Sequence, residues 1–158
     1  MGIKNAFYRS RAGLLKITSS GAALLGVRFS PPGAAARVSA PRGRLLRDCV
    51  RQLDEYFEGK RKAFRLPLRF CGTGFQVRVW RTLRQVPYGK KVPYSALASR
   101  ADFPKAVRAV ASAVARNPFA VLVPCHRIVA KNGGLAGYAW GVRKKKWLLK
   151  HEERPRRS

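Results

Sequence analysis

Acidic residues are scarce in this sequence. The 158 residues include 7 Asp and Glu against 34 Lys and Arg, which gives a formal net charge of +27. Long apolar runs are lacking too, since stretches such as 119–124 are far shorter than the roughly 20 residues that a membrane-spanning helix needs. A helical membrane span is therefore excluded, and the charge favours an anionic partner. Disorder is excluded as well, because 46% hydrophobic and 10% aromatic residues suffice for a folded core.

Cysteine and histidine are equally scarce. The three cysteines, Cys49, Cys71 and Cys125, show no CxxC spacing, which argues against a disulfide scaffold. With only His126 and His151 beside them, a four-ligand structural zinc site is disfavoured, and we expect neither a metal nor a cofactor. The N-terminus has no apolar core of secretory type, so we expect a cytoplasmic protein.

The first half of the chain has the pattern of a small α/β domain. Apolar and polar residues alternate over 13–19 and again over 25–29, which predicts an antiparallel hairpin. Apolar residues then recur every three or four positions over 45–57, which predicts an amphipathic helix that ends near Gly59. The segment 64–70 contains Pro67 and fits either an edge strand or a connector.

A domain boundary is predicted near Gly72. Thr73 and Gln76 have the spacing of a capping box, so a new helix is expected to start here. We therefore expect a domain of residues 1–72 and a second of residues 73–158. The first carries 15 basic and 4 acidic groups and the second 19 and 3, so their net charges are +11 and +16. Both halves are basic.

The second half is predicted to be mostly helical. Helices are expected over 94–100 and 105–116, with Pro104 at the first position of the longer one, and this pair suggests a helix-turn-helix. A buried strand is expected over 119–123 and a final helix over 142–152. Four cations, residues 143–146, crowd the start of that helix, where the helix dipole disfavours them unless an anion is near.

A Cys-His dipeptide is weak evidence of catalysis, but here it stands in a specific setting. The sequence Pro-Cys-His-Arg-Ile at 124–128 follows Asn117-Pro118 and precedes Gly137-Tyr138 and Trp-Leu-Leu-Lys-His-Glu at 147–152. With Val-Pro-Tyr-Ser at 92–95, this combination closely resembles the O6-alkylguanine-DNA alkyltransferases, densely over 73–158 and more loosely over 1–72.

The resemblance implies roles for four catalytic residues. Cys125 would be the nucleophile and alkyl acceptor, and His126 would act as its base through a bridging water. Glu152 would orient His126, while Asn117 would brace the active-site turn. The chemistry agrees, because a free thiol of pKa near 8.5 is only about 3% ionised at neutral pH and needs a base.

The resemblance also implies residues that handle DNA. Arg108 would fill the space left by a base extruded from the duplex on the minor-groove side, and Tyr94 would help to rotate the nucleotide out. Ala106, Ala109 and Arg127 would complete the DNA-contacting set, the alanines by letting the helix approach closely.

Four residues would form the substrate pocket by the same resemblance. The segment carrying Tyr138, Ala139 and Trp140 would close over the guanine, and the backbone near Ile128 would help to read its edges. The tryptophan would narrow the mouth of the pocket.

The whole resemblance implies a ribonuclease H-like α/β domain followed by a winged-helix-like domain. The activity expected is irreversible transfer of an alkyl group from O6 of guanine in double-stranded DNA, with O4 of thymine also open, to Cys125 once per molecule. We expect a monomer without an obligate protein partner, nucleoid-associated when bound to DNA.

Two alternatives remain open at this point. One is a winged-helix protein that binds lesions without chemistry, although relatives of that type replace the cysteine and this chain retains Cys125. The other is a basic nucleoid or ribosome-associated protein, which uses only the net charge of +27 and leaves the motif unexplained.

Overall fold

The computed structural model describes residues 2–31 and 40–153, which fall into two compact units. Unit 1 contains residues up to Phe70 together with Pro118–Ala120, and unit 2 contains Cys71–Asn117 and Val121–Glu153. Sequence analysis placed the boundary at Gly72, and its separation into domains 1–72 and 73–158 stays a prediction. In the part of the chain that the structure describes, no helix combines the length and apolar character needed to span a membrane.

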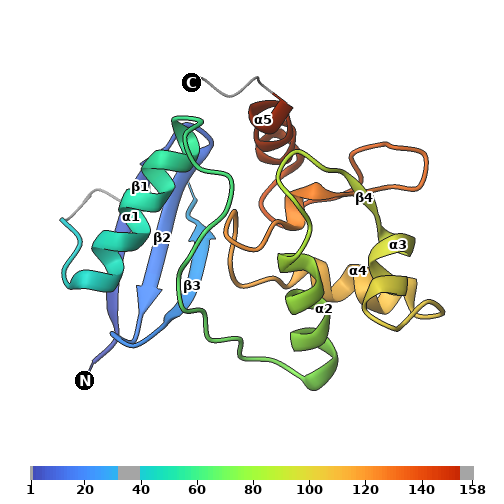
Figure 1. Cartoon of the computed structure of the whole chain (residues 1–158), viewed down its shortest axis with the longest axis horizontal. Helices are drawn as coiled ribbons and strands as arrows, with labels where there is room; N and C mark the ends of the chain where they lie inside the picture. The colour runs from blue at the N-terminus through green and yellow to red at the C-terminus, as the bar shows by residue number, and fades with distance from the viewer. Residues whose placement is uncertain (1, 32–39, 154–158) are drawn as a thin grey trace. The chain divides into compact units, whose positions relative to one another are not determined.

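Unit 1 is an antiparallel sheet covered on one face by a helix (Figure 1). Its strands β1 (Lys4–Ser10), β2 (Gly13–Ser19) and β3 (Leu24–Phe29) follow one another in the sheet, and α1 (Arg44–Phe57) packs on β1 and β2. Buried side chains of the sheet and of α1 form a common core: Ala6, Leu15, Ile17, Val27, Leu46, Cys49, Leu53 and Tyr56. The predicted hairpin and helix are thus present.

Two further segments pair with β3. The amide of Leu24 donates to the carbonyl of Pro67, and that of Arg69 donates back to Leu24. Farther along β3, the amide of Val27 donates to Pro118, whose neighbouring residues belong to the same unit. Segment 64–70 is therefore mainly a connector with one isolated bridge at Leu68.

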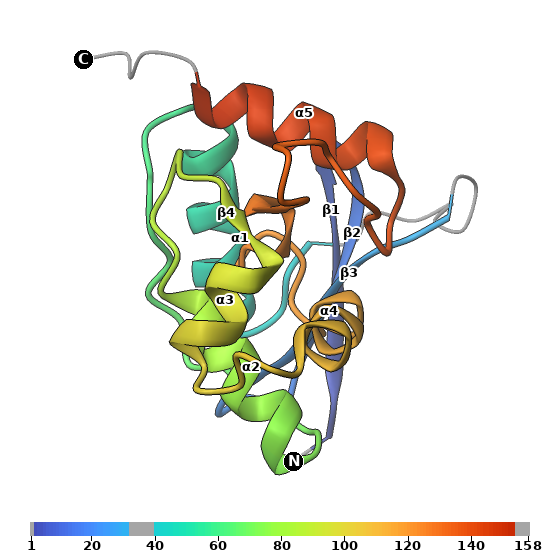
Figure 2. The same cartoon turned by 90° about the vertical axis from the view of Figure 1, so that its right-hand side faces the viewer.

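Unit 2 is mostly helical (Figure 2). It consists of α2 (Gly74–Arg84), β4 (Val92–Pro93), α3 (Tyr94–Arg100), α4 (Val107–Ala115), the short 3-10 helix η1 (Cys125–Arg127), β5 (Ile128–Val129) and α5 (Val142–Glu153). The capping box predicted from Thr73 and Gln76 is confirmed, since both of its hydrogen bonds form at the start of α2. The indole Nε1 of Trp80 donates to the carbonyl of Ala113 at 2.8 Å and so ties α2 to α4.

Two predictions of local structure were wrong, and one element, the first strand β1, was not predicted at all. The helix expected from Lys105 begins at Val107, because Pro104 lies in a turn and Ala106 is the N-cap residue. The strand expected over 119–123 is absent, since Val121 has φ of 70° and the chain turns there while remaining buried.

Candidate active site

A hydrogen-bonded turn holds Cys125. The amide of Cys125 donates to the carbonyl of Val123 at 2.8 Å, and the buried side chain of Asn117 donates to the same carbonyl at 2.9 Å. The turn continues through η1 into β5, which pairs in parallel with β4. Because Tyr94 directly follows β4, this pairing brings the start of α3 close to Cys125.

Cys125 is buried, with 3% of its surface exposed. Burial raises its pKa to about 11, although hydrogen bonds from Asn117 and Tyr138 and the charge of Lys145 act in the opposite direction. The neutral thiol is therefore the resting form, and the surrounding donors are arranged to favour the thiolate once a base removes the proton.

Lys145 is a buried cation that sequence analysis did not assign to the site. Its side chain is fully buried, and its Nζ donates to the carbonyl of Gly137 at 3.1 Å. Burial lowers its pKa, while the nearby Cys125 raises it. Of the four cations at the start of α5, this one faces an incipient anion, as the unfavourable helix dipole had suggested.

Hydrogen bonds to the carboxylate of Glu152 connect His126 and Arg127 inside unit 2. Nε2 of His126 lies 2.7 Å from Oε2 of Glu152. The guanidinium of Arg127 donates to both oxygens of that carboxylate, at 2.8 and 2.9 Å, and its Nη1 donates to the carbonyl of Val86 at 2.7 Å. A further hydrogen bond reaches Glu152 from the amide of Gly89 at 3.3 Å. All of these groups belong to a buried, charge-assisted network.

The network fixes the protonation states of its members. Burial alone would raise the pKa of Glu152, but hydrogen bonds and charge from His126 and Arg127 outweigh it and hold the pKa far below its usual range. Burial lowers the pKa of His126 below 6.5 despite the opposing effect of Glu152. A neutral imidazole therefore lies beside an ionised carboxylate at pH 7.

Those states determine the tautomer of His126. An ionised carboxylate only accepts hydrogen bonds, so the ring nitrogen facing Glu152, Nε2, carries the proton. The other nitrogen, Nδ1, is buried and has no hydrogen-bond partner among the described residues. Its lone pair is thus the basic position of the ring.

Arg127 is not on the surface, where a residue that contacts DNA would have to lie. Its side chain is buried, and its donors are engaged by Glu152 and Val86. The prediction that Arg127 contacts DNA does not fit this geometry, and the residue instead neutralises the buried carboxylate. No local sequence pattern could predict the pairing of Arg127 with Glu152, because the two residues are 25 positions apart.

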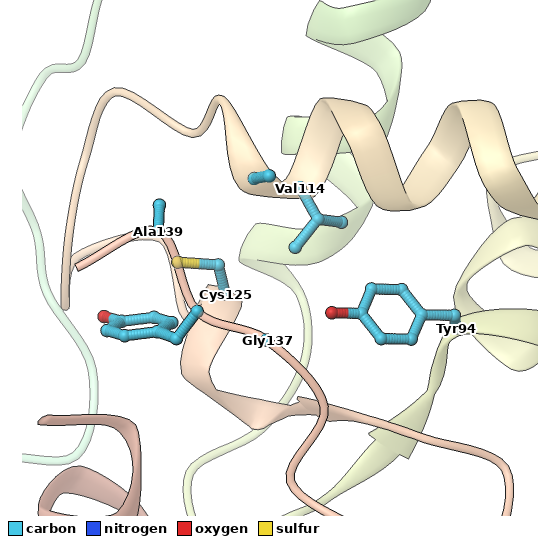
Figure 3. Close-up of a pocket in the computed structure, with 7 residues that line it drawn as sticks. Tyr94, Val114, Cys125, Gly137 and Ala139 are labelled. Carbon is cyan, nitrogen blue, oxygen red and sulfur yellow. The ribbon is translucent and has the colours of Figure 1, made fainter. Parts of the chain in front are cut away.

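A cavity of about 260 Å³ opens beside the thiol. Its wall consists of Tyr94, Val114, Ala115, Cys125, Gly137, Tyr138 and Ala139. Figure 3 shows the hydroxyl of Tyr94 pointing towards Cys125 across this space. The predicted pocket residues Tyr138 and Ala139 line the cavity. The other two predicted pocket residues, Ile128 and Trp140, do not line it. Ile128 is fully buried in β5, and the ring of Trp140 packs edge-on against that of Tyr138, with 5.5 Å between the ring centroids.

The remaining predicted residues lie on α4. Arg108 and Ala109 are exposed, while Ala106, the N-cap residue, is half-buried. The inner face of α4 is buried through Val110, and its C-terminal turn reaches the cavity with Val114. The helix thus presents small residues and one arginine to solvent and also contributes a wall of the cavity.

The protonation state of His126 predicts a loss of stability in acid. The unfolded histidine takes up a proton near pH 6.5, whereas the folded one resists it, so the unfolded state binds more protons below that pH. The free energy of unfolding should fall as pH drops below 6.5, with a slope of up to about 1.4 kcal/mol per pH unit. Urea unfolding at several pH values measures this.

Two variants separate this effect from general acid denaturation. His126→Gln should remove the fall between pH 6.5 and 5, and His151→Gln should retain it. An unchanged pH profile in His126→Gln would contradict the assigned protonation state.

Comparison with known proteins agrees with this architecture. The family model for the DNA binding domain of 6-O-methylguanine DNA methyltransferase matches residues 74–154, and the model for its ribonuclease-like domain matches residues 3–70. The inducible methylated-DNA–protein-cysteine methyltransferase of Bacillus subtilis is 46% identical over 103 residues, covering 65% of this chain and 58% of that protein. The corresponding protein of Methanosarcina barkeri is 44% identical over 70% of each chain.

Solved structures give the same result over nearly the whole chain. The O6-methylguanine methyltransferase of Mycobacterium tuberculosis superposes with a TM-score of 0.84 at 33% identity, covering 96% of this chain and 93% of that one. A complex of the Mycobacterium tuberculosis protein with DNA gives a TM-score of 0.85 at 34% identity, covering 94% and 92%. The predicted family and fold class are confirmed: the chain belongs to the 6-O-methylguanine DNA methyltransferase family.

Proposed function

We propose that this protein repairs DNA by moving an alkyl group from O6 of guanine onto Sγ of Cys125, once per molecule. One observation carries the proposal: the buried thiol lines a cavity large enough for a single base, and the next residue in η1, His126, is hydrogen-bonded to the buried Glu152 of α5. The names and DNA complex of the relatives support the substrate.

The base in this mechanism is Nδ1 of His126. It takes the proton of the Cys125 thiol through a bridging water, and Nε2–H stays bonded to Glu152. The imidazolium that forms is stabilised by the carboxylate, whose own charge is held in place by Arg127. Glu152 and Arg127 are thus positioning residues.

The transfer step balances without a cofactor. A lone pair of the thiolate forms the new S–C bond, and the C–O6 bond breaks with its electrons passing into the purine ring. The ring then takes up a proton at N1, so the proton lost by Cys125 is returned to the product. Because the thioether does not revert, the protein is consumed by one reaction.

Electrostatics around Cys125 favour the charged intermediate. Lys145, Asn117 and Tyr138 each lower the pKa of the thiol, and the first two are held by hydrogen bonds to backbone carbonyls in the structure without substrate. Preorganised donors of this kind stabilise developing charge without reorganisation. Asn117 also braces the turn through its bond to Val123.

The exposed side of α4 fits the proposed docking on duplex DNA. Ala109 and the half-buried Ala106 let the backbone approach closely, and Arg108 extends far enough to replace an extruded base. Tyr94 stands at the cavity and would guide the nucleotide inwards. The segment of Tyr138 and Ala139 would cover the base, with Trp140 supporting Tyr138 from behind.

The proposal also covers the oligomeric state, the partners and the division into domains. The protein acts as a monomer on double-stranded DNA containing O6-alkylguanine, needs no obligate protein partner or cofactor, and associates with the nucleoid while bound. Residues 1–72 serve as a separate domain beside the DNA-binding domain 73–158. A lesion-binding protein without chemistry is disfavoured, because the chain retains a cysteine, Cys125, that lines the cavity and directly precedes the buried His126 in η1.

The direct test is mass spectrometry of the protein after mixing it one to one with a duplex containing O6-methylguanine. The peptide containing Cys125 should gain one methyl mass, and the gain should stop at one equivalent. Cys125→Ala should bind the duplex but remain unmodified, and Cys49→Ala should react normally. Binding without any modification of Cys125 in the unaltered chain would replace the proposal by noncatalytic lesion binding.

Lys145 is predicted to lower the pKa of the Cys125 thiol. Removal of its charge in Lys145→Met should raise the pKa of Cys125, because that charge lowers it in the present structure. The rate at which iodoacetamide modifies the peptide containing Cys125, followed by mass spectrometry as a function of pH, reports this pKa without DNA and apart from the exposed Cys71. The midpoint should move upwards, with tenfold less thiolate for each unit.

Lys146→Met is the matched control for that prediction, because Lys146 is the exposed neighbour on α5. It should leave the midpoint in place. Thermal unfolding of both variants establishes that they are folded, and an unmoved midpoint in folded Lys145→Met would refute the assigned influence.

Arg108 is predicted to act on base extrusion rather than on chemistry. Arg108→Ala should slow methyl transfer from duplex DNA by ten- to a hundredfold, since extrusion costs a few kcal/mol, and should slow transfer from single-stranded DNA far less. Arg116→Ala, which removes an exposed arginine at the C-cap of α4, is the control. Equal losses on both substrates would assign Arg108 to general phosphate binding.

A further inference from the structure

The sheet of unit 1 has one face that α1 does not cover. Strand register places a defined set of residues on this side, which we term the open sheet face: Asn5, Phe7, Arg9, Leu14, Lys16, Thr18, Gly26 and Arg28. The opposite side carries the core, as the buried Ala6, Leu15, Ile17 and Val27 show. Alternation along each strand therefore sorts the two sets cleanly.

Cations lie next to one another across this face. The register aligns Phe7 with Lys16 and Lys16 with Arg28, so one row crosses all three strands. Both cations are exposed, as is Arg9 two positions along β1. Gly26 itself is buried, because a Cβ there would lie 3.4 Å from the carbonyl oxygen of Pro118 and 3.6 Å from Nε of Arg28, so the accessible cations of this face are Arg9, Lys16 and Arg28.

This arrangement is unfavourable for the isolated protein. Like charges directly opposite on neighbouring strands destabilise a sheet. Within the described residues, neither Arg9, Lys16 nor Arg28 has an acidic group within ion-pair distance. An anion from outside the protein would relieve the repulsion.

Acidic residues of unit 1 are confined to the other side. Its four carboxylates belong to α1 or to the C-cap of that helix: Asp48, Asp54, Glu55 and Glu58. Asp54 accepts a hydrogen bond from Tyr8, which points to the helix side, and Glu55 pairs with Arg51 and Arg61. The helix side of the sheet therefore carries both acids and bases, whereas the open sheet face carries bases without acids.

We propose that the open sheet face is a second DNA-binding surface, which holds phosphates of the duplex backbone through Arg9, Lys16 and Arg28. The inference rests on the proposed function, because it takes DNA as the partner. Charge complementarity selects a polyanion, and the row of separate cations suits successive phosphates more than one compact anion. The hydroxyl of Thr18, already bonded to Asn5 at 2.9 Å, adds a polar group to the same face.

Binding of this kind is independent of sequence, because phosphate contacts position a protein on DNA without reading bases. The contact would increase the time that the protein spends on undamaged DNA during its search. It would therefore alter affinity and its dependence on salt but not the transfer step at Cys125.

The experiment compares the salt dependence of binding to a long undamaged duplex. Each phosphate contact contributes about 0.9 to the slope of log K against log salt concentration. The triple variant Arg9→Gln, Lys16→Gln, Arg28→Gln should therefore lower the slope by about 2 to 3. Its thermal unfolding temperature should not fall, because the change removes repulsion.

Two matched variants make the result specific. The triple variant Arg42→Gln, Arg44→Gln, Arg47→Gln removes the same charge from exposed positions at the start of α1 and should lower the slope by less than one unit. A charge-preserving variant, Arg9→Lys, Lys16→Arg, Arg28→Lys, should keep the original slope. Equal reductions in both neutralised variants, or no reduction in the first, would overturn the second surface.

Methyl transfer from a lesion-containing duplex at saturating protein separates this inference from the proposed function. The triple variant Arg9→Gln, Lys16→Gln, Arg28→Gln should become methylated at Cys125 at the same rate as the unaltered chain. Absence of methyl transfer in the unaltered chain would overturn the proposed function, whereas normal transfer with an unchanged salt slope would overturn only the second surface.

Discussion

The carboxylate of Glu152 is the group on which the candidate active site depends. It is buried, so its charge costs several kcal/mol of lost hydration unless partners replace the water. Arg127 supplies two hydrogen bonds and a full positive charge, and His126 supplies one more bond. Because Arg127 neutralises the carboxylate, His126 is free to remain neutral and basic. Removal of either Arg127 or Glu152 would leave the buried charge of the other uncompensated.

Cys125 differs from Glu152 in that its surroundings keep it in the neutral form at rest. Burial raises the pKa of Cys125 to about 11, which leaves roughly one thiol in ten thousand ionised at pH 7. A protein that reacts only once gains from this, because a resting thiolate would be lost to oxidants and other electrophiles. In the proposed reaction, the base at His126 and the charge of Lys145 act only when an alkyl group is held within the cavity. Low resting reactivity and efficient transfer are therefore compatible.

Local patterns predicted the parts of the molecule whose cause is local. The capping box of Thr73 and Gln76 involves residues three apart, and the periodicity of α1 reflects one face of one helix. By contrast, Arg127 and Lys145 are buried through partners distant in the sequence, so their own neighbourhoods resemble any basic surface. The apolar run 119–123 failed for a related reason, because burial without periodicity fits a buried turn as well as a strand.

The effect of the excess positive charge depends on where the few acidic residues lie in the structure. The chain's few acids serve local bonds: Glu55 joins Arg51 and Arg61, Asp102 pairs with Arg78, and Glu152 organises the site. Acids placed this way do not screen distant cations, because ion pairs act over a few ångströms and salt limits longer fields to about 10 Å. A face without acids therefore keeps its full positive potential toward an anionic partner. The net charge of +27 is thus less informative than its distribution, since the same total spread evenly would favour no particular face.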